Sequence, residues 1–113
     1  MIEGQGPRMT LATQLVLRQL LEDPSREMYG LEIGATAGLP SGTVQPILAR
    51  LEGLGWLESR WEELDPRDVG RPRRRYYCLT KDGVELARLA LGRVRVPVNG
   101  PLVWQPRLVG DST

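Results

Sequence analysis

The chain of 113 residues predicts one mainly α-helical domain that carries a small β-hairpin. Apolar residues recur at helical spacing in three segments, and a short turn, Leu39-Pro40-Ser41-Gly42, separates the second from the third. Further along, an arginine-rich stretch lies between two short segments with strand character. We divide the chain into a flexible N-terminal arm (1–9), a folded domain (10–92) and an extended, proline-rich tail (93–113).

Two helices are predicted before the turn. Thr10 caps the first, which runs to about Glu22 and ends before Pro24. Its apolar positions form a helical stripe: Leu11, Leu15, Val16, Leu20 and Leu21. The second helix is predicted from about Tyr29 to Ala37, and Gly38 is placed to terminate it. The residues predicted in and around its buried face are Leu31, Ile33, Ala35 and Ala37.

The helix after the turn begins with Ser41 as its cap and runs to about Leu54. One face is predicted to enter the core: Val44, Ile47, Leu48, Leu51 and Leu54. Segments 56–61 and 73–79 are the predicted strands of the hairpin, with the two tryptophans of 56–61 mainly in its core. Thr80 caps a last helix over about 81–91. A hairpin that follows two helices joined by a short turn predicts a winged helix-turn-helix.

The composition argues against an enzyme. The chain has no histidine, which removes the commonest general base and metal ligand. One cysteine, Cys78, cannot form a structural zinc site or an internal disulfide. No nucleotide-binding glycine motif is present. We therefore expect no catalytic residues, no cofactor and no metal.

The same sequence lacks signals for a membrane or for export. No stretch approaches the roughly 18 consecutive apolar residues of a membrane span. The N-terminus lacks the charged-then-apolar order of a secretory signal. A single cysteine also suits a reducing compartment. These features predict a cytoplasmic protein.

Positive charge is concentrated in the predicted hairpin. Residues 67–80 hold five arginines and one aspartate, a net charge of +4, whereas residues 1–66 carry a net charge of −5. Such a tip predicts a wing that follows a phosphate backbone. Its candidate DNA-binding residues are Arg71, Arg73, Arg74 and Arg75, of which we expect Arg71 to be the freest and Arg74 to face away from its two neighbours. The alternative is a solvated loop that balances the acids Glu62, Glu63, Asp65 and Asp68.

The face of helix 41–54 that does not enter the core is the predicted base-reading surface. Its small and polar side chains allow close approach to a groove: Ser41, Gly42, Thr43, Gln45, Pro46 and Arg50. A glutamine can pair with adenine, and an arginine with guanine or a phosphate. Tyr29 could donate to a phosphate or pack under the first helix. The simpler alternative for the whole face is a merely soluble surface.

Three strings, MYGLEI (28–33), SGTVQPILARLEGLGWLES (41–59) and GRPRRRYYCLTKDG (70–83), resemble the PadR family of bacterial transcriptional regulators. The resemblance implies a repressor that binds double-stranded DNA as a homodimer, at a pseudo-palindromic operator. It places residues 41–50 in the recognition helix and 70–75 in the wing. It also implies a small aromatic or drug-like effector.

Two features depart from that family pattern. Gln45 stands where members commonly have a tyrosine, and the proline-rich tail stands where members have a long C-terminal helix. We therefore expect the tail to pack on its own or a partner subunit and to help form the dimer. A second hypothesis is a winged-helix module for protein contact, whose tail adds a strand to a partner. The basic hairpin favours DNA.

Overall fold

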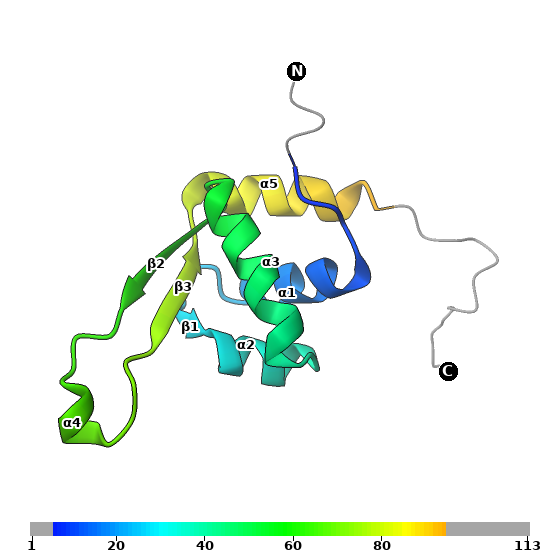
Figure 1. The fold of residues 1–113 in the computed structure, drawn as a ribbon. Coiled ribbons are helices and arrows are strands. Elements are labelled where there is room, and N and C mark those ends of the chain that lie inside the picture. The colour runs from blue at the N-terminus through cyan, green and yellow to red at the C-terminus, as the bar shows by residue number, and fades with distance from the viewer. Residues whose placement is uncertain (1–5, 95–113) are drawn as a thin grey trace.

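The computed structural model describes residues 6–94, which form a mainly helical domain with a small sheet. The elements are α1 (Leu11–Leu21), β1 (Met28–Tyr29), α2 (Gly30–Ala37), α3 (Ser41–Gly53), β2 (Leu57–Trp61), α4 (Pro66–Val69), β3 (Arg75–Leu79) and α5 (Lys81–Gly92). The hairpin of β2 and β3 projects from the helical body as a wing, with α4 at its tip (Figure 1). The predicted fold class is confirmed.

The predicted N-terminal arm (1–9) and C-terminal tail (93–113) lie largely outside the residues that the structure describes. The proposed role of the tail also lies outside residues 6–94. Within that range, no helix has the length and apolarity that a bilayer crossing requires.

The sheet has three antiparallel strands in the order β1-β3-β2. Met28 pairs with Tyr77, and Trp61 pairs with Arg75 at the far end of the hairpin. Because strand side chains alternate between faces, Tyr77 points into the core whereas Tyr76 lies on the outer face. β1 was not predicted, since two residues are too few to show an alternating pattern.

The core forms where the helices cover the inner face of the sheet. Its fully buried aliphatic side chains come from three helices: Val16, Leu17, Ile33, Val44, Leu48 and Leu51. Trp56, Leu57, Tyr77 and Leu79 close it from the sheet side, and Ala87 from α5. The predicted core face of α3 is confirmed at four of its five positions. Leu54 is exposed because it follows the last turn of the helix.

Two predicted core leucines point to solvent instead. Leu11 is 70% exposed, and the buried stripe of α1 passes through Leu17, which the sequence pattern had not selected. Leu31 is 67% exposed and Ala35 is exposed as well, whereas the predicted Ile33 is fully buried together with Gly30 and Gly34. Hydrophobicity therefore identified Ile33 on the buried side of α2 but not the two glycines that are buried beside it.

Two predicted threonine caps are present, whereas the serine cap is not. Thr10 Oγ1 accepts from the Thr13 amide at 3.1 Å, and Thr80 Oγ1 accepts from the Gly83 amide at 2.8 Å. Ser41 was expected to cap α3, but it is already the first helical residue, and Pro40 precedes it without a side-chain cap. The Pro40 carbonyl accepts the first intrahelical bonds, so the helix begins one residue earlier than predicted.

The connection from Glu62 to Arg74 contains the short helix α4, which was not predicted. Asp65 caps it by accepting from the Arg67 amide at 2.9 Å, Pro66 occupies its first turn, and Gly70 ends it at a φ of 71°. These start and stop signals are in the sequence, but four residues are too few for helical periodicity. Strand β3 also begins later than predicted, at Arg75 rather than Arg73.

Candidate nucleic-acid interface

A close approach between α2 and α3 positions the predicted recognition helix. A Cβ atom added at Gly34 would lie 2.7 Å from the Leu39 carbonyl oxygen, so only glycine fits where the turn passes. Gly38 terminates α2 at a φ of 75°, a left-handed conformation that favours glycine. Gly30 leaves room for the Gln45 side chain, which packs over the first turn of α2.

The outer face of α3 carries the residues that the sequence selected for it. All but one of these candidates are exposed: Ser41, Gly42, Gln45, Pro46 and Arg50. Thr43 is partly buried at the edge of the face, and exposed Ala49 adds another small side chain. Arg50 makes no ion pair within residues 6–94. The face therefore carries small and polar side chains and one unpaired cation, Arg50, toward the end of the helix.

Tyr29 links the start of α2 to the outer face of the sheet. Its ring meets the ring of Tyr76 edge-to-face, with 5.7 Å between the centroids. The Arg74 guanidinium lies 4.2 Å from the centroid of the Tyr29 ring. Tyr29 thus packs against β3 and not under α1, and the cation–π contact joins the wing to the helix-turn-helix.

The arginines of the wing fall into two groups. Three form ion pairs with nearby acids: Arg67 with Asp65 at 3.1 Å, Arg71 with Glu62 at 2.7 Å, and Arg75 with Glu52 at 3.6 Å. Arg73 and Arg74 make no ion pair within the described part of the chain, although Arg73 Nε donates to the Leu64 carbonyl at 2.7 Å. The expectation that Arg71 is the freest of the four is wrong, because Glu62 holds its guanidinium through both terminal nitrogens.

Arg74 and Arg75 extend to opposite faces of the wing, as strand alternation predicted. Arg74 lies over Tyr29 on the outer face. The Arg75 guanidinium lies 4.9 Å from the Trp61 ring centroid and points toward Glu52 of α3. Trp61 is 55% exposed, so the prediction of a core tryptophan holds for Trp56 and fails for Trp61.

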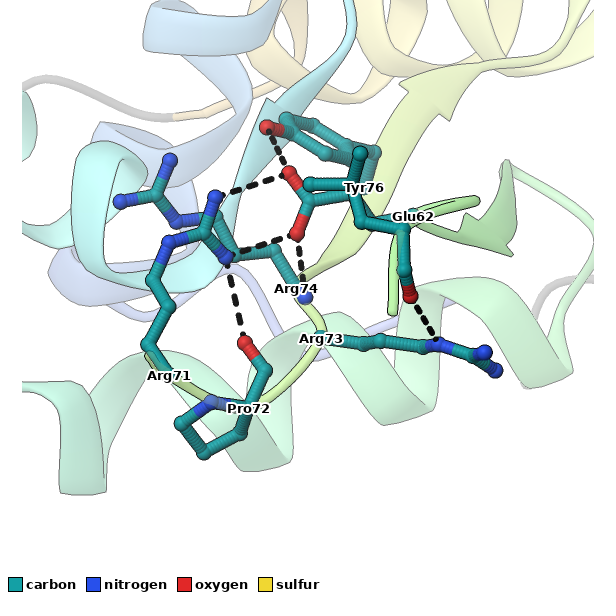
Figure 2. Close-up of polar contacts among 7 residues, drawn as sticks. Glu62, Arg71, Pro72, Arg73, Arg74 and Tyr76 are labelled. Atoms are coloured by element: carbon teal, nitrogen blue, oxygen red, sulfur yellow. Dashed lines mark hydrogen bonds and ion pairs between the residues drawn. The ribbon is translucent and has the colours of Figure 1, made fainter. Parts of the chain in front are cut away.

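Glu62, which follows β2, bonds to residues before and within β3 and so connects the two sides of the wing, as Figure 2 shows. Its carboxylate accepts from Arg71 at 2.7 and 3.1 Å, from the Arg74 amide at 3.1 Å and from the Tyr76 hydroxyl at 3.4 Å. The Arg71 guanidinium is the main reason why the pKa of Glu62 falls to about 2, and the Arg74 amide and Tyr76 add to the effect. Sequence reasoning treated Glu62 only as a neighbouring acid. The available signal was its position in the sequence: Glu62 directly follows β2, and in a hairpin that position faces the residue just before β3.

Cys78 is a structural residue of β3. Its thiol is half-buried, with Sγ 3.3 Å from the Pro24 carbonyl oxygen. Burial raises the pKa of the thiol, and the acids Glu58, Glu27 and Asp23 act in the same direction. The reactive thiolate is therefore disfavoured. Residues 6–94 also contain no cluster of His, Cys, Asp and Glu side chains that could hold a metal ion.

Comparison with known families identifies this architecture. The model of the transcriptional regulator PadR-like family matches residues 16–88, which is more than half of the chain. The chain belongs to this family. The resemblance seen in the sequence is confirmed, and the family is one of transcriptional regulators rather than enzymes.

Solved structures with the same fold include DNA-bound proteins. AbfR of Staphylococcus epidermidis is 25% identical, with a TM-score of 0.59 over 77% of this chain and 54% of AbfR. Reduced AbfR bound to DNA is 28% identical, with a TM-score of 0.57 over 74% of this chain and 56% of that one. BpsR of Bordetella bronchiseptica, 19% identical, has a TM-score of 0.60 over 80% of this chain and 64% of BpsR, which supports the fold alone. The chain spans about half the length of AbfR, and no curated protein sequence matches it.

Proposed function

We propose that this PadR-like protein represses transcription by binding double-stranded DNA sequence-specifically. The recognition helix α3 enters the major groove, and the wing follows the phosphate backbone. The observation that carries this proposal is that the start of α3 and the tip of the wing point to the same side of the molecule (Figure 1). The turn that starts α3 and the tip of the wing lie on the side of the molecule away from α5 (Figure 1).

Gln45 and Arg50 are the proposed base-reading residues on α3. Both residues are exposed, and both side chains can form paired hydrogen bonds with a base edge. In the free protein the amide of Gln45 lies beside Gly30 at the start of α2. Ser41, Gly42, Thr43 and Pro46 are small enough for the helix to approach the groove closely. The free amides of the first helical turn can also donate to a phosphate.

The unpaired arginines of the wing, Arg73 and Arg74, are the proposed phosphate ligands. Tyr29 positions Arg74 through the contact between its ring and the guanidinium, and its hydroxyl group can donate to the same backbone. Arg71 and Arg75 contribute indirectly. The Arg71–Glu62 ion pair holds the wing together internally, and the Arg75–Glu52 ion pair joins the wing to α3.

A homodimer is proposed from the family resemblance. Helix α5 lies on the side of the molecule away from the wing tip (Figure 1). Two of its leucines, Leu86 and Leu89, are exposed, which supports a subunit contact through this helix. The sequence-based proposal that the tail helps to form this dimer is tested by sedimentation of a chain ending at Gly92. A dimer as stable as that of the full chain would show that the tail is not needed.

A small aromatic or drug-like effector is proposed on the resemblance alone. Its test is a change in DNA affinity on titration with such compounds.

Selection of duplexes from a randomised pool tests the DNA-binding proposal directly. We expect the full chain to enrich a pseudo-palindromic sequence and to bind it more tightly than a scrambled duplex of the same composition. Equal retention of all sequences would contradict sequence-specific recognition. No retention at all would favour the alternative of a protein-interaction module.

A further inference from the structure

We infer that Glu62 is a positioning residue for DNA recognition, which neutralises Arg71 and anchors the wing. Within residues 62–75, Arg73 and Arg74 are then the only arginines without an ion pair. This inference rests on the proposed function and deepens it. It assigns different roles to arginines that look equivalent in the string GRPRRR.

The first step of the argument is the way in which the hairpin closes. The Glu62 amide donates to the Arg74 carbonyl at 2.8 Å, one residue beyond the last ladder pair of Trp61 and Arg75. The Arg74 amide donates in return to the Glu62 carboxylate at 3.1 Å. A side chain thus completes the closing pair of the hairpin, and removing it leaves the Arg74 amide without this acceptor.

The second step is the burial of the ion pair. The Glu62 side chain is 13% exposed and that of Arg71 is 32% exposed, and Glu62 is the least exposed carboxylate among the ion pairs of residues 6–94. Arg71 Nη1 also donates to the Pro72 carbonyl at 3.1 Å. A bidentate, partly buried pair of this kind is stronger than an exposed one, so Arg71 is not a free phosphate ligand.

The third step is the position of the remaining cations. Arg74 lies over Tyr29, which belongs to the helix-turn-helix, and the Glu62 carboxylate reaches both the Arg74 amide and the Tyr76 hydroxyl. Figure 2 shows these groups around one carboxylate. Glu62 therefore fixes the backbone of Arg74 at the point where its guanidinium meets Tyr29. A loose wing with a third free cation would bind phosphates at any sequence and would weaken discrimination.

The test compares Glu62→Ala with Glu63→Ala, which removes the same charge from the exposed neighbouring acid. The probes are a duplex that the wild-type protein enriches from a randomised pool and a scrambled duplex of the same composition. For Glu62→Ala we expect a several-fold lower ratio of the two affinities. We also expect a salt slope steeper by up to about 0.9 per subunit, because the freed Arg71 meets a phosphate. Glu63→Ala should change both affinities by one common factor and leave the ratio and the slope unchanged.

Adding Arg71→Gln to Glu62→Ala separates the two effects. The slope should return to the wild-type value because the extra cation is gone, whereas the affinity ratio should stay low because the wing is still unanchored. Equal behaviour of Glu62→Ala and Glu63→Ala, or an unchanged ratio in Glu62→Ala, would overturn the inference.

Hydrogen exchange of the Arg74 amide in the free protein tests the anchor without DNA. We expect protection in the wild-type protein and in Glu63→Ala, and its loss in Glu62→Ala. An Arg74 amide that exchanges freely in the wild-type protein would overturn the inference whatever the DNA experiments show. If the anchor is present and no duplex binds, the proposed function has failed and the structural role of Glu62 has not.

Discussion

The helix-turn-helix and the wing present their polar residues in opposite ways. On α3, a fully buried row that includes Val44, Leu48 and Leu51 fixes the helix, and the base-reading candidates on its outer face make no ion pair within residues 6–94. In the wing, no side chain of α4 is buried, and three of the five arginines from 67 to 75 are paired with acids. Packing orders the first region, whereas charge and hydrogen bonds order the second.

This difference indicates that an arginine count overstates the positive charge available to DNA. The wing is the most basic part of the sequence, yet only Arg73 and Arg74 are without an ion pair in its described structure. Arg50 of α3, in a region with a negative net charge, is also unpaired. The unpaired arginines of the candidate interface therefore come both from α3 and from the wing.

The largest expected effect is the loss of packing beneath α3. Leu48 is fully buried, so Leu48→Ala should lower the free energy of unfolding by about 2–5 kcal/mol through the cavity it creates. Leu31→Ala, at a position that is 67% exposed, should stay within about 0.5 kcal/mol. Urea unfolding of both variants measures the difference. Similar losses would show that α2 and α3 pack differently from this structure.

The next effect concerns base reading by α3. Gln45→Ala should cost about 1–3 kcal/mol at the preferred base pair and scarcely change binding to unrelated DNA. Binding to duplexes substituted at single positions measures this cost. Gln19→Ala makes the same chemical change on α1 and should leave specificity intact. A uniform loss across all sequences would mean that Gln45 contacts only the backbone.

Salt dependence distinguishes the free from the paired cations. The double variant Arg73→Ala/Arg74→Ala should flatten the slope of log affinity against log salt by roughly two to four units for a dimer. Lys81→Ala/Arg88→Ala removes the same charge from exposed positions of α5 and should leave the slope nearly unchanged. Salt titrations with one duplex compare the two variants. An unchanged slope in a folded Arg73→Ala/Arg74→Ala protein would remove the main physical support for a DNA-binding wing.

The smallest expected effect is the acid titration of the wing anchor. Because Arg71 lowers the pKa of Glu62 from 4.5 to about 2, the anchor should be fully present above pH 4.5 and lost as the pH falls through 2. The carboxyl carbon shift of Glu62 in NMR spectra follows this titration. In Arg71→Ala the midpoint should move up toward the ordinary value, since the main cause of the shift is gone. A wild-type midpoint near 4.5 would contradict the bidentate pair.

Local patterns were enough for α3 and for the threonine caps. Four buried positions of α3 recur at i, i+3, i+4 and i+7, and this spacing places its polar residues on the opposite face. Thr10 and Thr80 each stand before a helix and bond an amide three residues on. These features depend on neighbours within one helical turn, which the sequence displays directly.

Other features had no such local signal. β1 is two residues long and exists because β3 offers it a partner. α2 buries two glycines, because the close approach of α3 and the turn leaves no room for larger side chains there. Leu31 and Leu11 are apolar and nevertheless exposed.

The sequence by itself determined the order of the four longer helices and the hairpin, the polar outer face of α3 and the basic character of the wing. Only the tertiary structure decided which arginines of that wing are free. Glu62, Glu63 and Asp65 are all close to Arg71 along the chain, but the hairpin brings Glu62 alone within bonding distance of it. An ion pair depends on where two side chains meet in space, and composition records only that both are present.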